Sequence, residues 1–309
     1  MLLANSPIEQ KQLLGLDVFI KRDDLLHPAF GGNKARKFSA LLEMDFSDVD
    51  TLIGYGSAQA NSLFTMASLA QLKGCQLEFY VDHISQWLKN NPNGNYRAAL
   101  ELGARIIEVG ELDDREGLSV AEYIAQKVLP YKQGALFVPE GGRCHLAASG
   151  VEQLALELAE WQQAQSKDKV RVVLPSGTGT TALFLSRFFF SQQLDIRVLT
   201  VPAVGGEDYL RLQFNELEPD SSLHPDIVEL GRKYHFGKLY PEFFTLWQQA
   251  CACGVEFELL YDPVGLMALQ QAFAAEPDAT WIYIHQGGVL GNETMLPRYR
   301  RKFPGLFVG

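Results

Sequence analysis

The sequence predicts an α/β fold built from two open, twisted, mostly parallel sheets with flanking helices. Two observations lead to this fold class: short β-rich apolar runs alternate with longer amphipathic stretches, and glycine-rich loops join several runs to the stretch that follows. Strands separated by helical patterns of this length are typical of βαβ units. The predicted strands are 18–21, 51–55, 77–81, 105–109, 136–138, 170–174, 196–201, 256–260 and 281–285.

Helical patterns follow most of these strands. The predicted helices cover 34–42, 61–73, 95–102, 120–129, 147–164, 180–191, 241–251 and 266–275. Residues 205–232 are the least regular region, and the polar run 216–222 is expected to be a surface loop. Since no linker separates domains, we expect two interleaved lobes, a larger one made of 1–41 and 151–309 and a smaller inserted one made of 42–150.

Charge and hydropathy exclude several classes of partner. The chain has 309 residues, with 27 basic and 37 acidic side chains and a formal net charge of −10. This excess repels phosphate backbones and anionic lipid, so neither nucleic acid nor a membrane is expected as a partner. No stretch approaches ~18 uncharged apolar residues, and residues 1–10 lack the pattern of a signal peptide. We therefore expect a cytoplasmic protein.

The cysteines do not form a disulfide framework or a metal site. There are four, and the pair Cys251 and Cys253 is a C-x-C sequence, unlike the C-x-x-C of zinc and redox sites. No second pair matches it. We expect structural thiols in a reducing compartment and no bound metal.

The first candidate loop leads into the predicted helix at 34–42. Gly31 and Gly32 allow a sharp turn just before Lys34, and Arg36 and Lys37 follow closely. A lysine becomes a nucleophile only where desolvation or nearby cations lower its pKa, and Lys37 at i+3 lies on the same helix face. Lys34 is therefore a candidate nucleophile. The alternative is a solvated, basic helix start.

A second loop, 54–62, follows a predicted strand and precedes a helix. Its small polar residues include Ser57, Gln59 and Asn61, with Ala60 between the last two. At a helix N-terminus such residues present N–H groups and side chains to a carboxylate or a ring oxygen. An equally good interpretation is a capped turn in which Asn61 or Ser57 is the N-cap.

The third loop has the pattern of an anion-binding turn. It reads Ser176-Gly177-Thr178-Gly179-Thr180-Thr181 and connects a strand to a helix. Two glycines let the backbone wrap a phosphate, the threonines add hydroxyl donors, and the helix dipole favours negative charge. The loop is not a P-loop, because no Gly-Lys-Ser/Thr follows, and alanine at 182 breaks the dinucleotide pattern.

The fourth loop follows the predicted strand 281–285. Gln286 at the strand end can hydrogen-bond the edge of a ligand, whereas His285 is expected to be a satisfied core histidine. A phosphate cradle, a lysine that can be activated and polar loops at strand ends together suit one organic cofactor. That cofactor is pyridoxal 5′-phosphate held by a Schiff base.

Four segments resemble a known family. Residues 20–24 with 30–37 resemble the cofactor-lysine motif of the 1-aminocyclopropane-1-carboxylate deaminase / D-cysteine desulfhydrase family. Residues 138–143, the loop 176–181 and residues 285–288 follow in the family's order. That family belongs to the tryptophan-synthase-β-like (fold type II) pyridoxal phosphate enzymes, and the resemblance runs from about Lys21 to Gly291.

The resemblance implies a role for each motif. Lys34 carries the cofactor and moves the substrate α-proton, and Tyr261 is a second catalytic group. Gln286 or Asp262 faces the pyridine nitrogen. The remaining assignments are Asn61 on the ring 3′-oxygen, Ser176, Gly177, Thr178, Gly179 and Thr180 on the phosphate, and Ser57, Gln59, Ala60 and Asn61 around the substrate. Relatives tend to be homodimers, so a homodimer is expected.

Three departures from the family pattern shape the expected reaction. Ala60 stands where the family usually has a catalytic serine, Phe236 replaces a second family tyrosine, and Gln286 stands where desulfhydrases tend to carry threonine. An amide leaves the pyridine nitrogen unprotonated more readily than a carboxylate does. A weaker electron sink favours β-elimination or deamination over full carbanion chemistry. Opening a cyclopropane ring makes demands on the missing serine and tyrosine, so we expect β-elimination and not ring opening.

The expected function is therefore that of a pyridoxal-phosphate-dependent deaminase or lyase. Its substrate is a small amino acid, and its products are ammonia and a 2-oxo acid. The alternatives are a dehydratase, racemase or sulfhydrylase of the same fold, or a cofactor-binding sensor that has lost catalysis.

Overall fold

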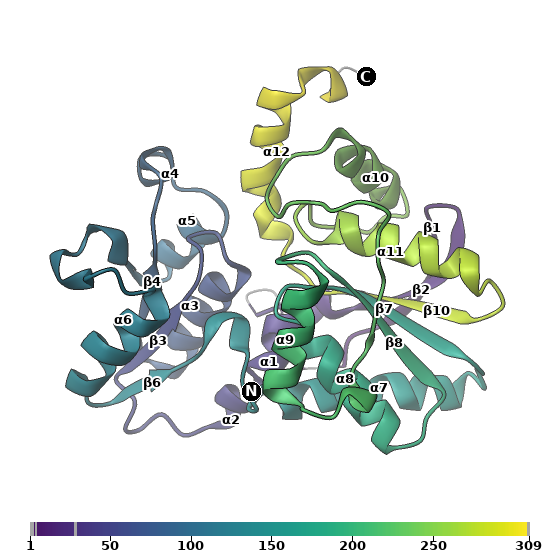
Figure 1. Cartoon of the computed structure of the whole chain (residues 1–309), viewed down its shortest axis with the longest axis horizontal. Coiled ribbons are helices and arrows are strands. Elements are labelled where there is room, and N and C mark those ends of the chain that lie inside the picture. Colours follow the sequence, from purple (N-terminus) through teal and green to yellow (C-terminus); the bar gives the residue numbers. More distant parts are fainter. Residues whose placement is uncertain (1–2, 4, 28–29, 308–309) are drawn as a thin grey trace. The chain divides into compact units, whose positions relative to one another are not determined.

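The computed structural model describes residues 3, 5–27 and 30–307. The chain folds into two compact units (Figure 1). One unit consists of residues 40–144, and the other of the described residues of 3–39 together with 145–307. Each unit has its own sheet and its own helices, which confirms the prediction of two mostly parallel sheets flanked by helices. The lobe boundaries predicted at 41 and 150 remain a prediction.

The larger unit is organised around a six-stranded sheet with the order β1-β2-β10-β7-β8-β9. Its strands are β1 (Ile8–Leu13), β2 (Leu16–Arg22), β7 (Val170–Ser176), β8 (Ile196–Pro202), β9 (Asp226–Ile227) and β10 (Thr280–His285). Only the β1–β2 pair is antiparallel. The carboxyl ends of β2, β10, β7 and β8 therefore meet at one edge, where ligands of open α/β sheets bind.

Helices cover both faces of this sheet (Figure 1). Helices α7 (Ala147–Ala164) and α8 (Thr180–Ser191) pack on one face, and α10 (Pro241–Cys251) and α11 (Asp262–Ala275) pack on the other. Strand β10 shows why both faces are apolar: Trp281 and Tyr283 join one core, and Ile282 and Ile284 join the other. Burial on both faces is the reason that these strands read as nearly continuous apolar runs.

The smaller unit has a four-stranded parallel sheet with the order β5-β4-β3-β6. The strands are β3 (Thr51–Tyr55), β4 (Gln76–Val81), β5 (Arg105–Glu108) and β6 (Ala135–Phe137). The helices include α3 (Asn61–Lys73), α4 (Gln86–Asn90), α5 (Gly94–Glu101) and α6 (Val120–Tyr123). Helix α3 packs on β3 and β4, while Ile53 and Tyr80 point into the cluster formed with α6.

Four predicted helices fold with the predicted bounds, and other segments differ from the prediction. Helices α3, α7, α8 and α10 have the predicted bounds. The helix predicted at 34–42 breaks at Phe38 into α1 (Gly32–Lys37) and α2 (Ser39–Glu43), because Phe38 leaves helical geometry with φ −101° and ψ 6°. The prediction of an irregular region at 205–232 was wrong in part, since it contains α9 (Glu207–Leu217).

Two elements at the chain ends were not predicted. Strand β1 is an edge strand of the sheet, and apart from Ile8 and Leu13 its residues are polar or charged. Helix α12 (Asn292–Lys302) carries Pro297 inside it and is rich in charged residues. Both lack the long apolar periodicity by which the other elements were recognised.

The strand predicted at 256–260 does not exist, because side chains satisfy its backbone. The N–H of Leu259 donates to Asn292 Oδ1 at 2.9 Å, and the N–H of Leu260 donates to Glu258 Oε2 at 3.1 Å. The carbonyl of Phe257 accepts from the indole of Trp247 at 2.6 Å. A chain whose hydrogen bonds are met in this way needs no neighbouring strand.

The basic start of α1 is buried and not solvated. Arg36 is 1% exposed and bonds to Glu157 at 2.6 Å and to Asp23 at 2.8 Å. Lys21, also 1% exposed, donates to Glu157 at 2.5 Å. Lys37 is 3% exposed. The alternative of a solvated helix start was therefore wrong, and Arg36 forms ion pairs with two buried carboxylates, Asp23 and Glu157.

Gly150 allows α7 to lie directly against α1. A Cβ atom at position 150 would lie 1.9 Å from the backbone oxygen of Arg36 and 2.1 Å from Ser39 Oγ. The first of these atoms is backbone and cannot turn aside. Close contact between the two helices therefore requires glycine at this position.

Gly150→Ala should destabilise the protein although alanine favours helices. The gain in helix propensity is about 1 kcal/mol, whereas forcing the helices apart costs about 1–3 kcal/mol or more. Urea denaturation followed by circular dichroism should show a lower midpoint. Ser149→Ala, at the neighbouring exposed position, is the matched control and should leave the midpoint unchanged. An equal or higher midpoint for Gly150→Ala would contradict the packing argument.

The cysteines are free thiols, as predicted. Burial raises the pKa of Cys251 to about 11, and its sulfur accepts the N–H of Phe257 at 3.5 Å. Among the residues that the structure describes, no helix is long and apolar enough to cross a membrane. Within the same residues, no cluster of three or more His, Cys, Asp or Glu side chains could hold a metal ion.

Candidate active site

Lys34 lies in the first turn of α1, which is anchored to the end of β10. The backbone N–H of Asn33 donates to the carbonyl of Gln286 at 3.1 Å, and Asn33 Nδ2 donates to Gln286 Oε1 at 2.8 Å. Gly32, with φ +70°, makes this approach possible, since a Cβ there would lie 1.8 Å from the same carbonyl. Lys34 Nζ, half-buried, donates to Asn33 Oδ1 at 3.3 Å.

Gln286 joins the lysine helix to the central strand. Its Nε2 donates to the carbonyl of Pro175 at 2.6 Å, while its Oε1 accepts from Asn33. One N–H of this primary amide remains for another acceptor. Lys34, Gln286 and the end of β7 are thus linked by a short chain of hydrogen bonds at the sheet edge where ligands are expected.

The loop after β7 has the geometry of an anion site. Gly179 has φ +71° and is the N-cap of α8, so the first N–H groups of α8 have no acceptor inside the helix. Thr178 Oγ1 and Thr180 Oγ1 lie 3.0 Å apart. In the described part of the chain, the buried Thr181 Oγ1 has no hydrogen-bond partner. Free amides, hydroxyls and the helix dipole fit a phosphate ester.

Ser176 differs from the other residues of this loop. Its hydroxyl is 2.6 Å from Thr200 Oγ1, which in turn donates to the carbonyl of Leu174. Ser176 is 4% exposed. Its side chain therefore holds β7 to β8, and the predicted contact of Ser176 with phosphate would have to come from its backbone.

Tyr261 lies beside this loop. A Cβ atom at Gly177 would be 3.5 Å from Tyr261 Cε1 and 3.6 Å from its hydroxyl oxygen. On its other side the Tyr261 ring packs on Phe236, with ring centroids 5.0 Å apart. The structure thus brings this predicted catalytic residue to the anion loop, although 84 positions separate Gly177 from Tyr261 in the chain.

Asp262 is committed to other partners. It is 2% exposed, its Oδ1 accepts from the hydroxyl of Tyr283 at 2.7 Å, and its Oδ2 accepts from the N–H of Glu258 at 2.9 Å. Burial raises the pKa of Asp262, and His285 partly offsets this effect. Of the two candidates for the pyridine nitrogen, Gln286 retains one uncommitted side-chain N–H, whereas both oxygens of Asp262 already accept hydrogen bonds.

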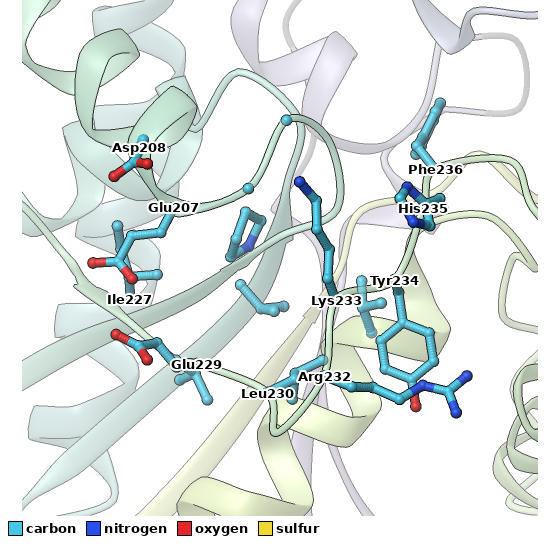
Figure 2. Close-up of a pocket in the computed structure, with 16 residues that line it drawn as sticks. Glu207, Asp208, Ile227, Glu229, Leu230, Arg232, Lys233, Tyr234, His235 and Phe236 are labelled. Carbon is cyan, nitrogen blue, oxygen red and sulfur yellow. The ribbon is translucent and has the colours of Figure 1, made fainter.

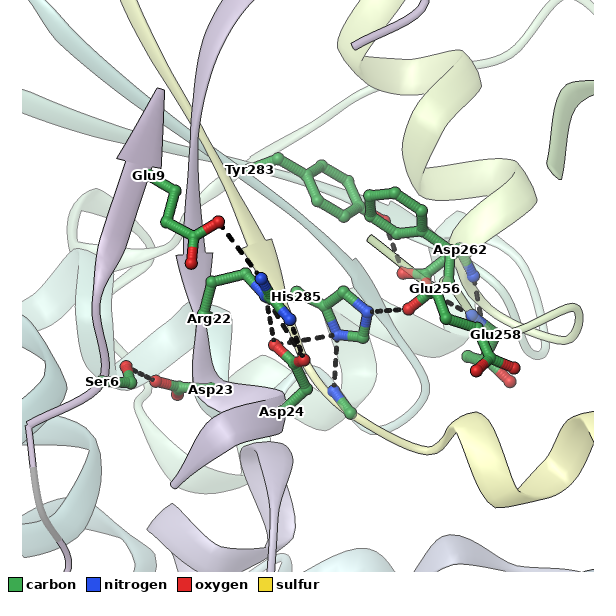
Figure 3. Close-up of polar contacts among 12 residues, drawn as sticks. Ser6, Glu9, Arg22, Asp23, Asp24, Glu256, Glu258, Asp262, Tyr283 and His285 are labelled. Atoms are coloured by element: carbon green, nitrogen blue, oxygen red, sulfur yellow. Dashed lines mark hydrogen bonds and ion pairs between the residues drawn. The ribbon is translucent and has the colours of Figure 1, made fainter. Parts of the chain in front are cut away.

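His285 is a satisfied core histidine, as predicted. It is fully buried, and its Nε2 lies 2.6 Å from the carbonyl of Glu256. The N–H of Gly287 donates to Nδ1 at 3.1 Å, so Nε2 carries the hydrogen. Figure 3 shows the ring between Glu256 and Asp24. Both nitrogens are occupied in supporting the loop that bears Gln286.

A cavity of about 530 Å³ lies next to Phe236. Figure 2 shows Phe236 and His235 at one end, with Glu207, Asp208 and Glu229 at the other. Phe236 is 44% exposed. Phe236 is therefore an accessible apolar ring, and it brings no hydroxyl to the neighbourhood of Tyr261. Its correspondence to the second family tyrosine stays a prediction.

The loop 54–62 lies in the smaller unit and differs from the capped-turn interpretation. The N-cap of α3 is Ala60, and no side chain caps this helix. Ser57 Oγ instead accepts the N–H of Gln59 at 3.3 Å. Asn61 Oδ1 accepts from Asn95 Nδ2 at 2.9 Å, and no described residue accepts a hydrogen bond from Asn61 Nδ2. Asn61 Nδ2 is thus a hydrogen-bond donor, which is the group that the predicted contact with the ring 3′-oxygen of the cofactor requires.

Asn95 was missed by sequence reasoning. It is 2% exposed, and its Nδ2 also donates to the carbonyl of Gln59 at 2.9 Å. Gln59 Nε2 donates to the carbonyl of Asn93 at 3.1 Å, and Gln59 Oε1 is buried without a partner among the described residues. Asn95 is 34 positions from Asn61, so no local pattern could have revealed it.

The structure brings together the predicted residues that belong to the larger unit, and the other predicted residues belong to the smaller unit. Lys34, Gln286, the loop 176–180 and Tyr261 all belong to the carboxyl edge of the large sheet or to the segments beside it. The remaining predicted residues, Ser57, Gln59, Ala60 and Asn61, belong to the smaller unit. Their place in the same site as Lys34 stays a prediction.

Comparison with known proteins gives the family. Residues 3–230 match a family model described as pyridoxal-phosphate dependent enzyme. A Pyrococcus horikoshii protein with the provisional name 1-aminocyclopropane-1-carboxylate deaminase is 27% identical over 291 residues, 90% of this chain and 86% of that protein. The D-cysteine desulfhydrase of Serratia proteamaculans is 33% identical over 175 residues, 54% of this chain and 51% of that enzyme.

Solved structures show the same fold. The crystal structure of a homologue of 1-aminocyclopropane-1-carboxylate deaminase matches with a TM-score of 0.79 and 22% identity, covering 98% of this chain and 94% of that one. Threonine deaminase isoform 2 from Solanum lycopersicum matches with a TM-score of 0.64 and 13% identity, covering 99% and 84%. These likenesses confirm the fold-type-II architecture.

The family resemblance recognised in the sequence is therefore confirmed, and so is the cofactor. The family model spans well over half of the chain, and the anion loop beside α8 fits the phosphate of that cofactor. The relatives named above fall in the deaminase and desulfhydrase group. The chain belongs to the family of pyridoxal-phosphate-dependent enzymes.

Proposed function

We propose that the protein releases ammonia and a 2-oxo acid from a small amino acid by β-elimination. The observation that carries this proposal is the neutral amide of Gln286, held between Asn33 and Pro175 at the end of β10. A neutral amide does not keep a pyridine nitrogen protonated, and Asp262 is bonded to Tyr283 and Glu258. A moderate electron sink suits the loss of a leaving group from Cβ.

The resemblance assigns the contacts of the cofactor to four segments of the chain. In this proposal Lys34 attaches it, the amides and hydroxyls of 177–180 bind its phosphate, and Asn61 Nδ2 donates to its ring oxygen. Gln286 offers its free N–H to the ring nitrogen. When bound, pyridoxal phosphate stabilises negative charge that develops at the substrate Cα.

Two side chains of the protein move protons. Lys34 removes the proton from Cα, and Tyr261 donates a proton to the leaving group on Cβ. Loss of H–X across the Cα–Cβ bond leaves an enamine, which water converts to ammonia and a 2-oxo acid. Both proton carriers belong to the larger unit, where the anion loop fixes the Tyr261 ring.

Ring opening of a cyclopropane substrate is disfavoured by two residues that lack hydroxyls. Ala60 replaces the family serine, and Phe236, beside Tyr261, replaces the second tyrosine. Elimination from a substrate with a good leaving group does not need either hydroxyl. Cysteine, serine and chloroalanine, in D or L configuration, are the substrates we expect. From the resemblance we also expect a homodimer, and from the charge and hydropathy of the sequence we expect a cytoplasmic protein.

A substrate panel tests the proposal. The purified holoenzyme should release ammonia and pyruvate from at least one of D-cysteine, L-cysteine, D-serine, L-serine and chloroalanine. With 1-aminocyclopropane-1-carboxylate we expect kcat/KM to be at least about 10²-fold lower, a difference of about 2.7 kcal/mol. Ammonia and 2-oxo acid are measured together with the enantiomeric composition of the remaining substrate.

Other outcomes correspond to the alternatives. Inversion of configuration without ammonia indicates a racemase, and incorporation of added sulfide indicates a sulfhydrylase. Elimination from serine alone, with none from cysteine or chloroalanine, is still β-elimination and identifies the enzyme as a dehydratase. Ring opening of the cyclopropane substrate at the higher rate, or cofactor binding without turnover of any compound, would overturn the proposal.

A further inference from the structure

The segment that leads to Tyr261 is supported by one buried carboxylate. Glu258 is 3% exposed, and its Oε1 accepts the backbone N–H groups of Tyr261 and Asp262, the latter at 3.2 Å. Its Oε2 accepts the N–H of Leu260 at 3.1 Å. Three consecutive amides therefore converge on a single side chain, and the middle one belongs to the predicted catalytic tyrosine.

A hydrogen bond to Asp262, which in turn bonds to Tyr283, holds Glu258 in place. Its own N–H donates to Asp262 Oδ2 at 2.9 Å, and Asp262 Oδ1 accepts from Tyr283 on β10 at 2.7 Å. Figure 3 shows the Glu258 and Asp262 carboxyl groups next to each other, with the Tyr283 hydroxyl on Asp262. Burial, together with the charge of Asp262, raises the pKa of Glu258 well above its usual range. The pair therefore retains a proton more readily than two exposed carboxylates.

A chain of hydrogen bonds runs from Tyr283 on β10 through Asp262 and Glu258 to the backbone of Tyr261. The Tyr261 ring lies beside Gly177, and Glu258 accepts the backbone N–H of Tyr261 just before α11 begins. Three hydrogen bonds from backbone N–H groups to one buried carboxylate give the segment the rigidity that a sheet would otherwise supply.

We propose that Glu258 is the positioning residue of Tyr261: by accepting the amides of residues 260–262 it holds the tyrosine ring against Gly177. The inference rests on the proposed function, in which Tyr261 donates a proton during elimination. Glu258 does not touch the reacting atoms in this scheme. Its effect on the reaction passes through Tyr261.

The experiment combines Glu258→Ala, Glu258→Gln, Tyr261→Phe and the double variant Glu258→Ala/Tyr261→Phe, all as holoenzyme. Tyr261→Phe should lower kcat by about 10²-fold or more, since loss of a general acid or base has effects of this size. Glu258→Ala should lower kcat to a similar degree and change KM by less than about 3-fold. The double variant should be no slower than the slower single variant, because both changes remove the same contribution.

Glu258→Gln is the conservative variant. It keeps Oε1, and with it the acceptor for Tyr261 and Asp262, but replaces the acceptor for Leu260 by an amide nitrogen. We expect it to recover at least about half of the lost kcat on a logarithmic scale. Glu256→Gln, an exposed carboxylate two residues earlier whose oxygen accepts from Asn292, is the matched control and should keep the wild-type kcat.

Hydrogen exchange provides a readout that does not depend on activity. In Glu258→Ala, peptides containing residues 260–262 should exchange much faster than in the wild type, while peptides from α8 and β7 keep their protection. Pyridoxal phosphate affinity should stay within about 3-fold of the wild type, because the anion loop is intact. If Glu258→Ala does not fold, Glu258→Gln and its exchange pattern carry the test.

Several results would overturn the inference. They are a wild-type kcat in Glu258→Ala, losses of kcat that add up in the double variant, or unchanged exchange of residues 260–262. If the wild type turns over nothing, the proposed function fails, but faster exchange in Glu258→Ala would still establish Glu258 as the support of this segment. If the wild type is active and exchange is unchanged, the positioning role fails alone.

Discussion

Lys34→Ala should lower the rate of ammonia release by at least about 10³-fold while leaving the fold intact. A general base contributes about 10²–10⁴-fold, and Lys34 also provides the covalent attachment of the cofactor in the proposed scheme. The side chain is only half-buried and projects from a helix that Asn33, Gln286 and Gly32 anchor independently of it. The midpoint of urea denaturation should therefore stay close to that of the wild type.

The attachment site can be mapped directly. Reduction of the wild-type holoenzyme with borohydride, followed by proteolysis and mass spectrometry, should place the pyridoxyl group on Lys34. Lys34→Ala should give no labelled peptide from residues 30–41. Lys302→Ala, an exposed lysine at the end of α12, is the matched control and should keep both activity and label. Full turnover by Lys34→Ala, or a label on another lysine, would contradict the assignment.

Glu157→Ala should give the largest loss of stability among substitutions outside the site. Glu157 accepts from Arg36 at 2.6 Å and 2.7 Å and from Lys21 at 2.5 Å, and all three side chains are nearly inaccessible to water. Removing the carboxylate leaves two buried cations with Asp23 as the remaining acid of the cluster. Leaving a buried charge without its partner costs about 3–5 kcal/mol. Denaturant titration of the holoenzyme measures the loss.

Two controls separate the charge effect from the loss of packing. Glu160→Ala changes an exposed glutamate on the same helix and should shift stability by less than about 0.5 kcal/mol. Glu157→Gln keeps the shape but not the charge, and it should be intermediate. Because Arg36 lies two residues after Lys34, Glu157→Ala should also weaken cofactor binding. Stability equal to that of Glu160→Ala would contradict the role assigned to this cluster.

The pH dependence of this difference has a defined sign. Burial raises the pKa of Glu157, but its hydrogen bonds and ion pairs with Arg36 and Lys21 outweigh that effect and hold the pKa below its usual value. A carboxyl whose pKa is depressed by folding contributes its full stability above about pH 4.3, the unfolded value. The stability difference between the wild type and Glu157→Gln should therefore be constant near neutral pH and shrink as pH falls below about 4.

Much of the candidate site is local and could be predicted from the sequence. Gly31, Gly32 and Lys34 lie within four consecutive residues. The Gly-Thr-Gly-Thr loop lies between a strand and a helix that the sequence pattern predicts. Each motif therefore needed only its own neighbours to be recognised. The double-sided burial of β7 and β10 likewise shows in their continuous apolar runs. These features follow from steric and hydrophobic rules that act over a few residues.

Other features depend on partners far away in the chain. Gln286 bonds Asn33 across 253 positions, and Glu157 neutralises Arg36 across 121. The segment 256–260 begins with glutamate and apolar side chains in alternation, as a strand would, yet the amide of Leu259 bonds to Asn292, 33 positions away. The sequence alone could not show that the N–H of Leu259 would bond to Asn292 and not to a neighbouring strand.

The sequence by itself determined the fold class and the cofactor and predicted the loops that hold it, because glycine turns, helix starts and apolar periodicity are properties of short segments. Only the tertiary structure decided that Arg36 is buried and neutralised, and that Gln286 retains one free N–H while both oxygens of Asp262 are occupied. It also decided that Glu258 accepts the backbone N–H of Tyr261. Those outcomes depend on which polar groups are buried together. A buried polar group must find its partner wherever the chain brings one within reach.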